Sequence, residues 1–412
     1  MKVLNFGSCN IDYVYLLDHI VNAGETESAD TLYVFSGGKG LNQSIAAARA
    51  GIPIAHAGCI GEDGEFLAEL LKNDHVDITH LKRTPGKTGH AMIQVSKRGE
   101  NAICIYPGSN AKVTCEDIDR VLACFDAGDM LLLQNEISNV PYLVEAAHKK
   151  GMRILLNPSP MNETIAQLDL SKLSYLILNE IEAVQITGAA DPMAALALFR
   201  RKYPELSVVL TLGKDGSIYQ DSQIQFRQPS FIVEAVDTTA AGDTFTGYFI
   251  AGIIRGEDIP TTMVTASCAS AISVSRSGAA PSIPHLAEVK EALPHMQLRD
   301  NSPKKDNKQQ LLAYIDEHLA DISLESLGDA LGYSTVYTGA YVAKVTGMNY
   351  QTYLRKRRLH AAAEMLRNTN MPVGDIIAAV GYKNESCFRK AFAEAYGKKP
   401  LDYRRDCVRK HD

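Results

Sequence analysis

The stretch Asp237-Thr238-Thr239-Ala240-Ala241-Gly242-Asp243-Thr244-Phe245 is the most informative part of this chain. Small residues and a glycine lead into an aspartate, and an apolar helical pattern follows. Amides at the start of a helix attract anions such as phosphate, and small residues let a ligand approach the backbone closely. An aspartate beside such an anion hole can take a proton from a hydroxyl that attacks the phosphate. An ordinary strand-to-helix turn with an acidic first turn would look the same, so other segments must decide.

The composition is that of a soluble globular protein with two or three domains. The chain has 412 residues, of which 46% are hydrophobic and 22% charged. No apolar run approaches the ~18 residues that span a membrane, and the first residues resemble a strand rather than a signal peptide. The eight cysteines form no CxxC pair. We therefore expect a cytoplasmic protein with reduced thiols and no structural zinc site.

Strand-like and helix-like segments alternate up to about residue 296. Short apolar strands are expected at residues 2–6, 130–133, 153–156, 175–178 and 208–212. Helical patterns lie between them, for example at residues 40–49, 141–149 and 192–201. This order predicts an α/β fold with a doubly wound, mostly parallel sheet covered on both faces. Residues 31–35, 91–95 and 102–106 break the alternation and predict a small β lid.

The last hundred residues differ in charge and pattern. Residues 297–307 are polar, contain a proline and are expected to be a linker between domains at 1–296 and 308–406. Beyond them Gly332-Tyr333 recurs as Gly381-Tyr382, each between two helical patterns, which predicts an all-α domain with two helix-turn-helix units. The net charge is −11 over residues 1–300 and +5 over residues 301–412. A basic module suggests an anionic partner, although a solvated positive surface remains an alternative.

Three further motifs carry polar groups at the ends of predicted strands. Asn10-Ile11-Asp12 follows the first strand and suits vicinal hydroxyls, but it also suits a turn. The glycine-rich stretch 37–43 opens a helix and is no Walker A loop, because its Gly-Lys is followed by glycine. Asn179 and Glu182 suit water-mediated Mg²⁺ binding beside a nucleotide, or a helix N-cap with an acidic first turn.

Together these motifs resemble the ribokinase-like (PfkB-type) sugar kinase family over about residues 1–295, and within it the ribokinases most closely. The matching segments, in order, are Gly7-Ser8-x-Asn10-x-Asp12, Gly37-Gly38-Lys39-Gly40-x-Asn42-Gln43, Asn157-Pro158-x-Pro160, Asn179-x-x-Glu182, Thr211-Leu212-Gly213 and the opening stretch. The resemblance implies ATP-dependent phosphorylation of a primary hydroxyl, with D-ribose giving ribose 5-phosphate. Another furanose or a nucleoside remains an alternative substrate.

The resemblance also implies a role for each matched residue. The implied sugar ligands are Asn10, Asp12, Gly38, Lys39, Asn42 and Glu136, together with Asp243. Asp243 would be the base, and the amides of Ala240, Ala241, Gly242 and Asp243 the anion hole. The nucleotide would contact Asn179, Thr211, Gly213 and Gly242, and Glu182 would hold Mg²⁺ through water. The implied ligands of an activating K⁺ are Asp237, Thr239, Ser273, Arg276, Gly278 and Ser282. His90 and Ser267 depart from the family pattern.

Residues 308–405 resemble the AraC-type DNA-binding domain, which implies a double-stranded DNA partner and a role in transcription regulation. The reading helices are expected at residues 334–345 and 385–395, with Ser386, Arg389 and Lys390 as candidate DNA contacts. Residues 355–358 are basic and suit either phosphate attraction or a solvated face. A homodimer formed through the lid is also expected. The competing hypothesis is a regulator whose kinase fold senses sugar or nucleotide without catalysis.

Overall fold

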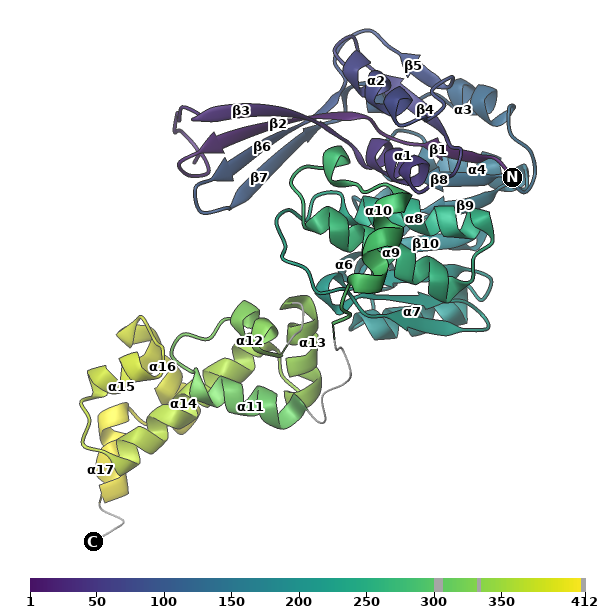
Figure 1. Cartoon of the computed structure of the whole chain (residues 1–412). Helices are drawn as coiled ribbons and strands as arrows, with labels where there is room; N and C mark the ends of the chain where they lie inside the picture. Colours follow the sequence, from purple (N-terminus) through teal and green to yellow (C-terminus); the bar gives the residue numbers. More distant parts are fainter. Residues whose placement is uncertain (300–306, 332–334, 409–412) are drawn as a thin grey trace. The chain divides into compact units, whose positions relative to one another are not determined.

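The computed structural model describes residues 1–299, 307–331 and 335–408. The chain divides into two compact units, Met1–Asp300 and Asn301–Asp412 (Figure 1). Gly332, Tyr333 and Ser334, which the sequence places in and after the first helix-turn-helix turn, lie outside the described residues. So do residues 300–306 of the expected linker. Within the described part, no helix is both long and apolar enough to cross a membrane.

The first unit is built on a large sheet whose strands are mostly parallel. In spatial order the strands are β13 (Gln225–Gln228), β12 (Ser217–Gln220), β11 (Ser207–Thr211), β10 (Tyr175–Asn179), β9 (Arg153–Leu156), β8 (Met130–Leu133), β1 (Val3–Phe6), β4 (Ala55–Ile60) and β5 (Leu81–Arg83). Only the pairs β11–β12 and β12–β13 are antiparallel. The predicted α/β fold is therefore confirmed.

Helices cover both faces of this sheet, and each face has its own apolar core. One face is covered by α1 (Lys39–Arg49), α2 (Glu65–Asn73), α8 (Ala241–Arg255), α9 (Ile259–Val274) and α10 (Leu286–Ala292). The other is covered by α3 (Cys115–Leu122), α4 (Val140–Lys149), α5 (Glu163–Ala166), α6 (Glu180–Thr187) and α7 (Pro192–Lys202). Short 3-10 turns are η1 (Gly108–Lys112), η2 (Leu170–Lys172), η3 (Gly213–Asp215), η4 (Ala280–Ser282) and η5 (Leu293–His295).

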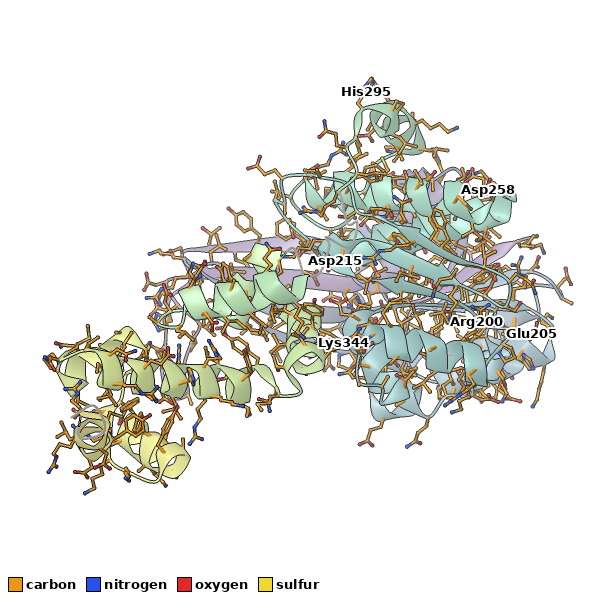
Figure 2. The ribbon with its side chains drawn as sticks, turned by 90° about the horizontal axis from the view of Figure 1, so that it is seen from below. Arg200, Glu205, Asp215, Asp258, His295 and Lys344 are labelled. Carbon is orange, nitrogen blue, oxygen red and sulfur yellow. The ribbon has the colours of Figure 1, made fainter. Side chains whose placement is uncertain are left out.

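Local side-chain chemistry fixes where several helices begin. Asp258, labelled in Figure 2, caps α9 by accepting a hydrogen bond from the Thr261 amide at 2.7 Å. Thr114 and Asp117 form a reciprocal capping box at the start of α3. Such caps satisfy backbone amides that have no partner inside the helix.

The lid is a second, four-stranded sheet with the order β3 (Thr31–Gly37), β2 (Asn10–Leu17), β6 (Gly89–Ser96) and β7 (Asn101–Tyr106). Figure 1 shows it extending from the large sheet as a separate layer. Three of its strands correspond to the predicted segments. The fourth, β2, begins at the Asn10-Ile11-Asp12 motif, so these residues lie where the lid leaves the body of the unit. The large exposed apolar side chains of the lid are Leu32, Tyr33, Val34, Phe35, Met92, Ile103, Ile105 and Tyr106.

The second unit is all-helical in its described part, as predicted. Its helices are α11 (Asn307–Glu317), α12 (Leu324–Leu331), α13 (Thr335–Thr346), α14 (Tyr350–Asn368), α15 (Val373–Ala379), α16 (Glu385–Tyr396) and α17 (Pro400–Val408). One core joins α11, α12, α13 and the start of α14, and a second joins the rest of α14 to α15 and α16. The long helix α14 therefore contributes to both cores.

The first residues of the expected linker pair with the first unit. Leu298 forms an isolated antiparallel bridge with Phe231. The Ile232 amide donates to the Gln297 carbonyl at 2.8 Å, and the Arg299 amide donates to the Ser230 carbonyl at 2.7 Å. Residues 297–299 thus continue the folded first unit, although their polar sequence resembles that of a linker.

Candidate active site

Asp243 lies in the first turn of α8, and its side chain is held from a second helix. The carboxylate accepts hydrogen bonds from Asn42 Nδ2 at 3.0 Å and from Gln43 Nε2 at 2.9 Å, both on α1. Only 6% of Asp243 is exposed. Two neutral amides thus fix the orientation of a buried carboxylate and stabilise its charge.

The start of α8 offers backbone amides beside this carboxylate. Ala240 adopts a left-handed conformation with φ = 60°, and the Thr244 amide donates to its carbonyl at 2.8 Å. The Ala241 amide donates to Thr238 O at 3.3 Å. No acceptor for the amides of Gly242 and Asp243 is found among the described residues. The helix therefore presents two free donors and its positive dipole end, which is suited to an anion.

Lys39 and Glu136 meet next to Asp243. The Lys39 amide donates to Glu136 Oε2 at 2.8 Å, and the Ser8 hydroxyl donates to the same oxygen. Burial lowers the pKa of the Lys39 ammonium, but the charges of Asp243, Glu136 and Glu182 outweigh it and raise that pKa above its ordinary value. Burial raises the pKa of Glu136 despite the Ser8 and Lys39 hydrogen bonds. The site thus gathers several charged groups away from water.

Asn10 and Asp12 approach the same region from β2. Asn110 Nδ2 donates to Asn10 Oδ1 at 2.7 Å, which leaves the Asn10 amide group able to donate to a ligand. Burial, with a smaller effect of Glu136, raises the pKa of Asp12 to about 6. A Cβ on Gly37 would lie 2.2 Å from an Asp12 carboxylate oxygen, so a larger residue there would displace the Asp12 carboxylate. Gly38, at φ = 94°, starts α1 in a conformation that favours glycine.

All four residues expected to bind the nucleotide line one pocket of about 540 Å³. They are Asn179, Thr211, Gly213 and Gly242. Its walls also include Phe231, Val233 and Phe245, so that a flat apolar group can be covered there. Ser267, the departure from the family pattern, lines the same pocket.

Asn179 and Glu182 form a capping box at the start of α6. The Asn179 side chain accepts from the Glu182 amide at 2.9 Å, and Glu182 Oε2 accepts from the Asn179 amide at 3.0 Å. The Ser159 hydroxyl donates to Glu182 Oε1. The helix-cap interpretation therefore describes these side chains, and both Glu182 oxygens already accept hydrogen bonds. Such a carboxylate is better suited to an outer-sphere than to a direct metal contact.

The six residues implied for K⁺ come together in pairs beside α8. Asp237 accepts from the Gly278 amide at 3.0 Å and from the Thr239 amide at 2.9 Å. The Ser273 and Ser282 hydroxyls share a hydrogen bond of 2.7 Å. The Arg276 side chain pairs with Glu288 at 2.7 Å, so only its backbone is available to a cation. Among the described residues, no donor is found for the carbonyls of Asp237, Thr239, Arg276, Gly278 and Ser282.

The structure adds three contacts that sequence reasoning did not assign. Gln43 touches Asp243, Asn110 touches Asn10 and Ser8 touches Glu136. Gln43 and Ser8 lie inside the quoted motifs, so their place in the sequence could have indicated that they belong to the site. Asn110 lies 100 residues from its partner and gave none.

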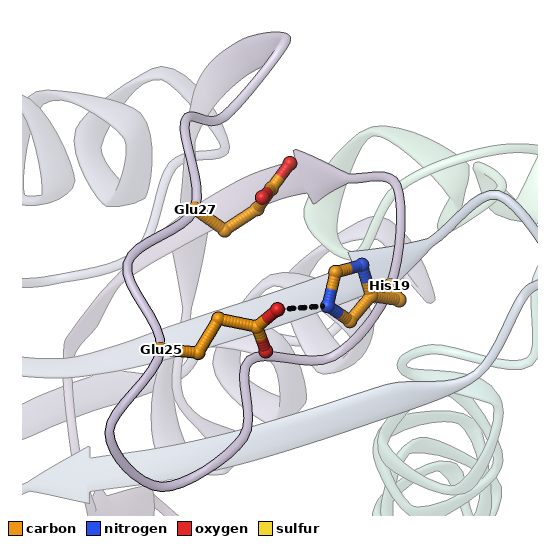
Figure 3. A group of neighbouring side chains, drawn as sticks. All are labelled: His19, Glu25 and Glu27. Atoms are coloured by element: carbon orange, nitrogen blue, oxygen red, sulfur yellow. Dashed lines mark hydrogen bonds and ion pairs between the residues drawn. The ribbon is translucent and has the colours of Figure 1, made fainter.

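One further group could offer metal ligands, in the loop between β2 and β3. His19 Nε2 and Glu25 Oε1 are 2.8 Å apart, with Glu27 nearby (Figure 3). Both glutamates are exposed, and Glu25 also accepts from the amide and side chain of Asn22. The cluster closes the loop by these bonds.

In the second unit, the candidate DNA contacts lie on α16. Ser386 and Lys390 are exposed, while Arg389 pairs with Glu385 one turn earlier. The basic stretch on α14 is largely occupied in internal contacts. Arg357 pairs with Asp316 at 2.7 Å, Arg358 donates to the Leu319 carbonyl at 2.7 Å, and Arg355 pairs with Glu394 at 2.9 Å.

Comparison with known proteins identifies the class to which this fold and site belong. Residues 1–286 match the pfkB family carbohydrate kinase model, and the chain belongs to that family of sugar kinases. Residues 327–406 match a helix-turn-helix domain.

Several of the individual relatives are ribokinases. Ribokinase from Haemophilus influenzae is 34% identical over 299 residues, covering 70% of this chain and 97% of the relative. The crystal structure of ribokinase from Thermotoga maritima aligns with a TM-score of 0.63 at 34% identity, covering 71% of this chain and 99% of that one. Arabidopsis thaliana ribokinase complexed with ribose and ATP aligns with a TM-score of 0.62 at 28% identity, covering 71% and 98%. The first unit is thus a ribokinase-like sugar kinase.

Proposed function

We propose that the first unit transfers the γ-phosphoryl group of ATP to the primary hydroxyl of D-ribose, giving ribose 5-phosphate and ADP. The observation that carries this proposal is the position of Asp243. Its oriented carboxylate lies beside the free amides of α8, between a polar cluster suited to hydroxyls and a pocket suited to a nucleotide. Phosphoryl transfer needs mainly positioning, charge stabilisation and a base, and these are the groups present.

The proposed roles follow the chemistry of each group. Asp243 takes the proton from the primary hydroxyl of the sugar. The hydroxyl oxygen attacks the γ-phosphorus, and the bond from the γ-phosphorus to the ADP oxygen breaks. The amides of Gly242 and Asp243 stabilise the charge on the transferring group. Asn10, Asp12, Lys39 and Asn42 orient the sugar. In support, Asn42 Oδ1 is buried without a hydrogen-bond partner among the described residues, so a sugar hydroxyl would complete it.

Two metal ions would assist. Glu182 would hold Mg²⁺ through its water shell, because both carboxylate oxygens are already bonded, and the ion would supply neutralisation of phosphate charge. K⁺ would be held by the unoccupied carbonyls around Asp237 and Gly278, since hard cations prefer oxygen ligands. Its chemistry would be electrostatic support of the anion hole.

A substrate panel tests this proposal. Full-length protein with ATP, Mg²⁺ and K⁺ is expected to turn over D-ribose with a higher kcat/KM than 2-deoxyribose, arabinose, fructose or adenosine. If another acceptor has a higher kcat/KM than D-ribose, that acceptor and not D-ribose is the substrate. No turnover of any acceptor, with intact nucleotide binding, would instead favour a sensor of sugar or nucleotide.

We also propose that the second unit binds double-stranded DNA through α16 and regulates transcription. The exposed side chains of Ser386 and Lys390 support this role, as does the match to a helix-turn-helix domain. Binding to the promoter of the protein's own operon should weaken as salt rises. Arg389→Ala should weaken it about tenfold or more, whereas Arg405→Ala, which removes an exposed arginine on α17, should not. Equal effects of both variants, or salt-insensitive binding, would contradict the proposal.

A homodimer through the lid is the remaining part of the proposal. Val34 and Met92 both lie opposite Tyr13 in the lid sheet and are 52% and 48% exposed, so apolar surface forms a row on one face. Exposed apolar patches of this kind often mark protein interfaces. Val34→Glu should convert a dimer to monomers in analytical ultracentrifugation. A wild-type protein that sediments as a monomer would refute this assembly.

A further inference from the structure

The nucleotide pocket contains a residue from the chain segment that leads toward the second unit. Arg299 lines the pocket together with Phe231 and Val233. Its backbone amide donates to Ser230 O at 2.7 Å, and the neighbouring Leu298 bridges Phe231. The segment 297–299 therefore pairs with the pocket wall through an isolated bridge and brings a cationic side chain to it.

This segment lies beyond the part of the chain that matches the sugar kinase family model. The family match ends at residue 286, and the Haemophilus relative is covered over 97% of its length by 70% of this chain. Arg299 thus lies outside the residues that the family model matches, although it lines the pocket.

The guanidinium of Arg299 is incompletely satisfied. Its Nε is buried and has no hydrogen-bond partner, and no ion pair of Arg299 is found among the described residues. A buried N–H without an acceptor is destabilising, and more so when the group is charged. Because this group also lines a pocket, a bound ligand could supply the missing acceptor.

The surroundings indicate which part of a nucleotide supplies that acceptor. The free amides of α8 suit the phosphates, whereas Phe231 and Val233 offer the apolar wall that a purine ring requires. A planar guanidinium can donate to ring nitrogens or ribose hydroxyls and can stack on a purine face.

We propose that Arg299 binds the base and ribose part of the nucleotide, and that nucleotide binding thereby stabilises the pairing of residues 297–299, which lead into the second unit. The proposal rests on the nucleotide role of the pocket described above. Nucleotide binding to the kinase site would then change the stability of the segment where the junction between the two units begins.

Isothermal titration of full-length protein with ADP tests the contact. Arg299→Ala should raise the Kd for ADP about tenfold, which corresponds to the loss of one hydrogen bond from a charged group. Arg299→Lys, which keeps the charge but loses the planar donor, should restore only part of the affinity. Arg227→Ala removes an exposed arginine on β13 and serves as the matched control, with an unchanged Kd. The KM for ribose should stay unchanged in all three variants.

Hydrogen exchange tests the stabilisation of this pairing. The backbone amides of Ile232 and residue 299 hold residues 297–299 in place by their hydrogen bonds to Gln297 O and Ser230 O. In the wild type, ADP should slow exchange of these two amides, and in Arg299→Ala it should not. If Arg299→Ala binds ADP as tightly as the wild type, the inference fails while the kinase proposal stands. A variant that also loses ribose affinity and melts earlier without ligand would show a structural role and overturn the inference. If the wild type binds no ADP, both proposals fall.

Discussion

Asp12 is the residue whose protonation state most directly links the site to pH. Its pKa is raised from an ordinary value of 3.8 to about 6, mainly by burial. Sugar hydroxyls donate hydrogen bonds and so require the ionised carboxylate. The KM for ribose should therefore be constant above pH 7 and rise about tenfold by pH 5. Steady-state kinetics across this range measure it, and a flat profile in the wild type would contradict the assignment.

The same shift has an opposite consequence for stability. Because the folded protein holds the Asp12 proton more tightly than the unfolded chain, the stabilising contribution of Asp12 is present at low pH and is lost as pH rises through 6. Asp12→Asn should therefore raise Tm at pH 7.5 and remove the pH dependence of KM. An unchanged or lower Tm would show that burial of this charge costs little.

Gln43 should act as a positioning residue, since it contacts Asp243 and is not itself among the residues expected to bind the sugar or the nucleotide. Gln43→Leu keeps the approximate volume but removes the donor to Asp243 Oδ1. We expect kcat to fall about 10- to 100-fold with the ribose KM nearly unchanged, because orientation of the base matters most in the transition state. Gln167→Leu, at an exposed position, is the control. A loss confined to KM would place Gln43 in sugar binding instead.

Single residues also show the limits of sequence reasoning. Asp243, Asn42 and Lys39 were recognisable because the residue types and spacing of their motifs are demanded by close backbone approach to a ligand. Asn110 and Arg299 were not, because each acts through a partner distant in sequence that only the folded sheet brings near. Polar side chains in loops and linkers carry no periodic signal.

At the scale of elements, α8 determines the chemistry, and its Gly242 is open to a decisive test. A Cβ at Gly242 would meet no atom within 4 Å, so the fold itself tolerates a methyl group. That group would occupy the space beside the free amides, where the phosphate is proposed to lie. Gly242→Ala should keep or raise Tm, since alanine favours helices, and should lower kcat/KM for ATP at least tenfold. If Gly242→Ala leaves kcat/KM for ATP unchanged, the phosphate does not bind beside these amides.

Elements differed in how well their patterns could be read. Buried strands such as β8 and β9 match the predicted residues because continuous apolar runs are distinctive. The lid strand β2 was not predicted, since its start is a polar motif that resembles a turn. The isolated bridge at Leu298 was not predicted either, because the pairing of so short a segment is set by its neighbour and not by its composition.

At the scale of the molecule, the two units have separate cores and should melt separately. The sheet helices form two cores in the first unit, and two others belong to the helical unit. Calorimetry of the full-length protein should show two transitions. ADP at 100 times its Kd should stabilise only one of them, by about 2.7 kcal/mol. A single transition that shifts as a whole would indicate that the units fold as one.

The central claim is that Asp243 is the base of an ATP-dependent sugar kinase. The most direct measurement follows ³¹P NMR of ATP and D-ribose with full-length wild type and Asp243→Asn, with Asp258→Asn as a control far from the site. The account predicts equal amounts of ribose 5-phosphate and ADP, and a loss of about 1,000-fold in kcat for Asp243→Asn with ADP binding retained. Turnover by Asp243→Asn at the wild-type rate would contradict it, as would equal inactivity of both proteins on every sugar and nucleoside.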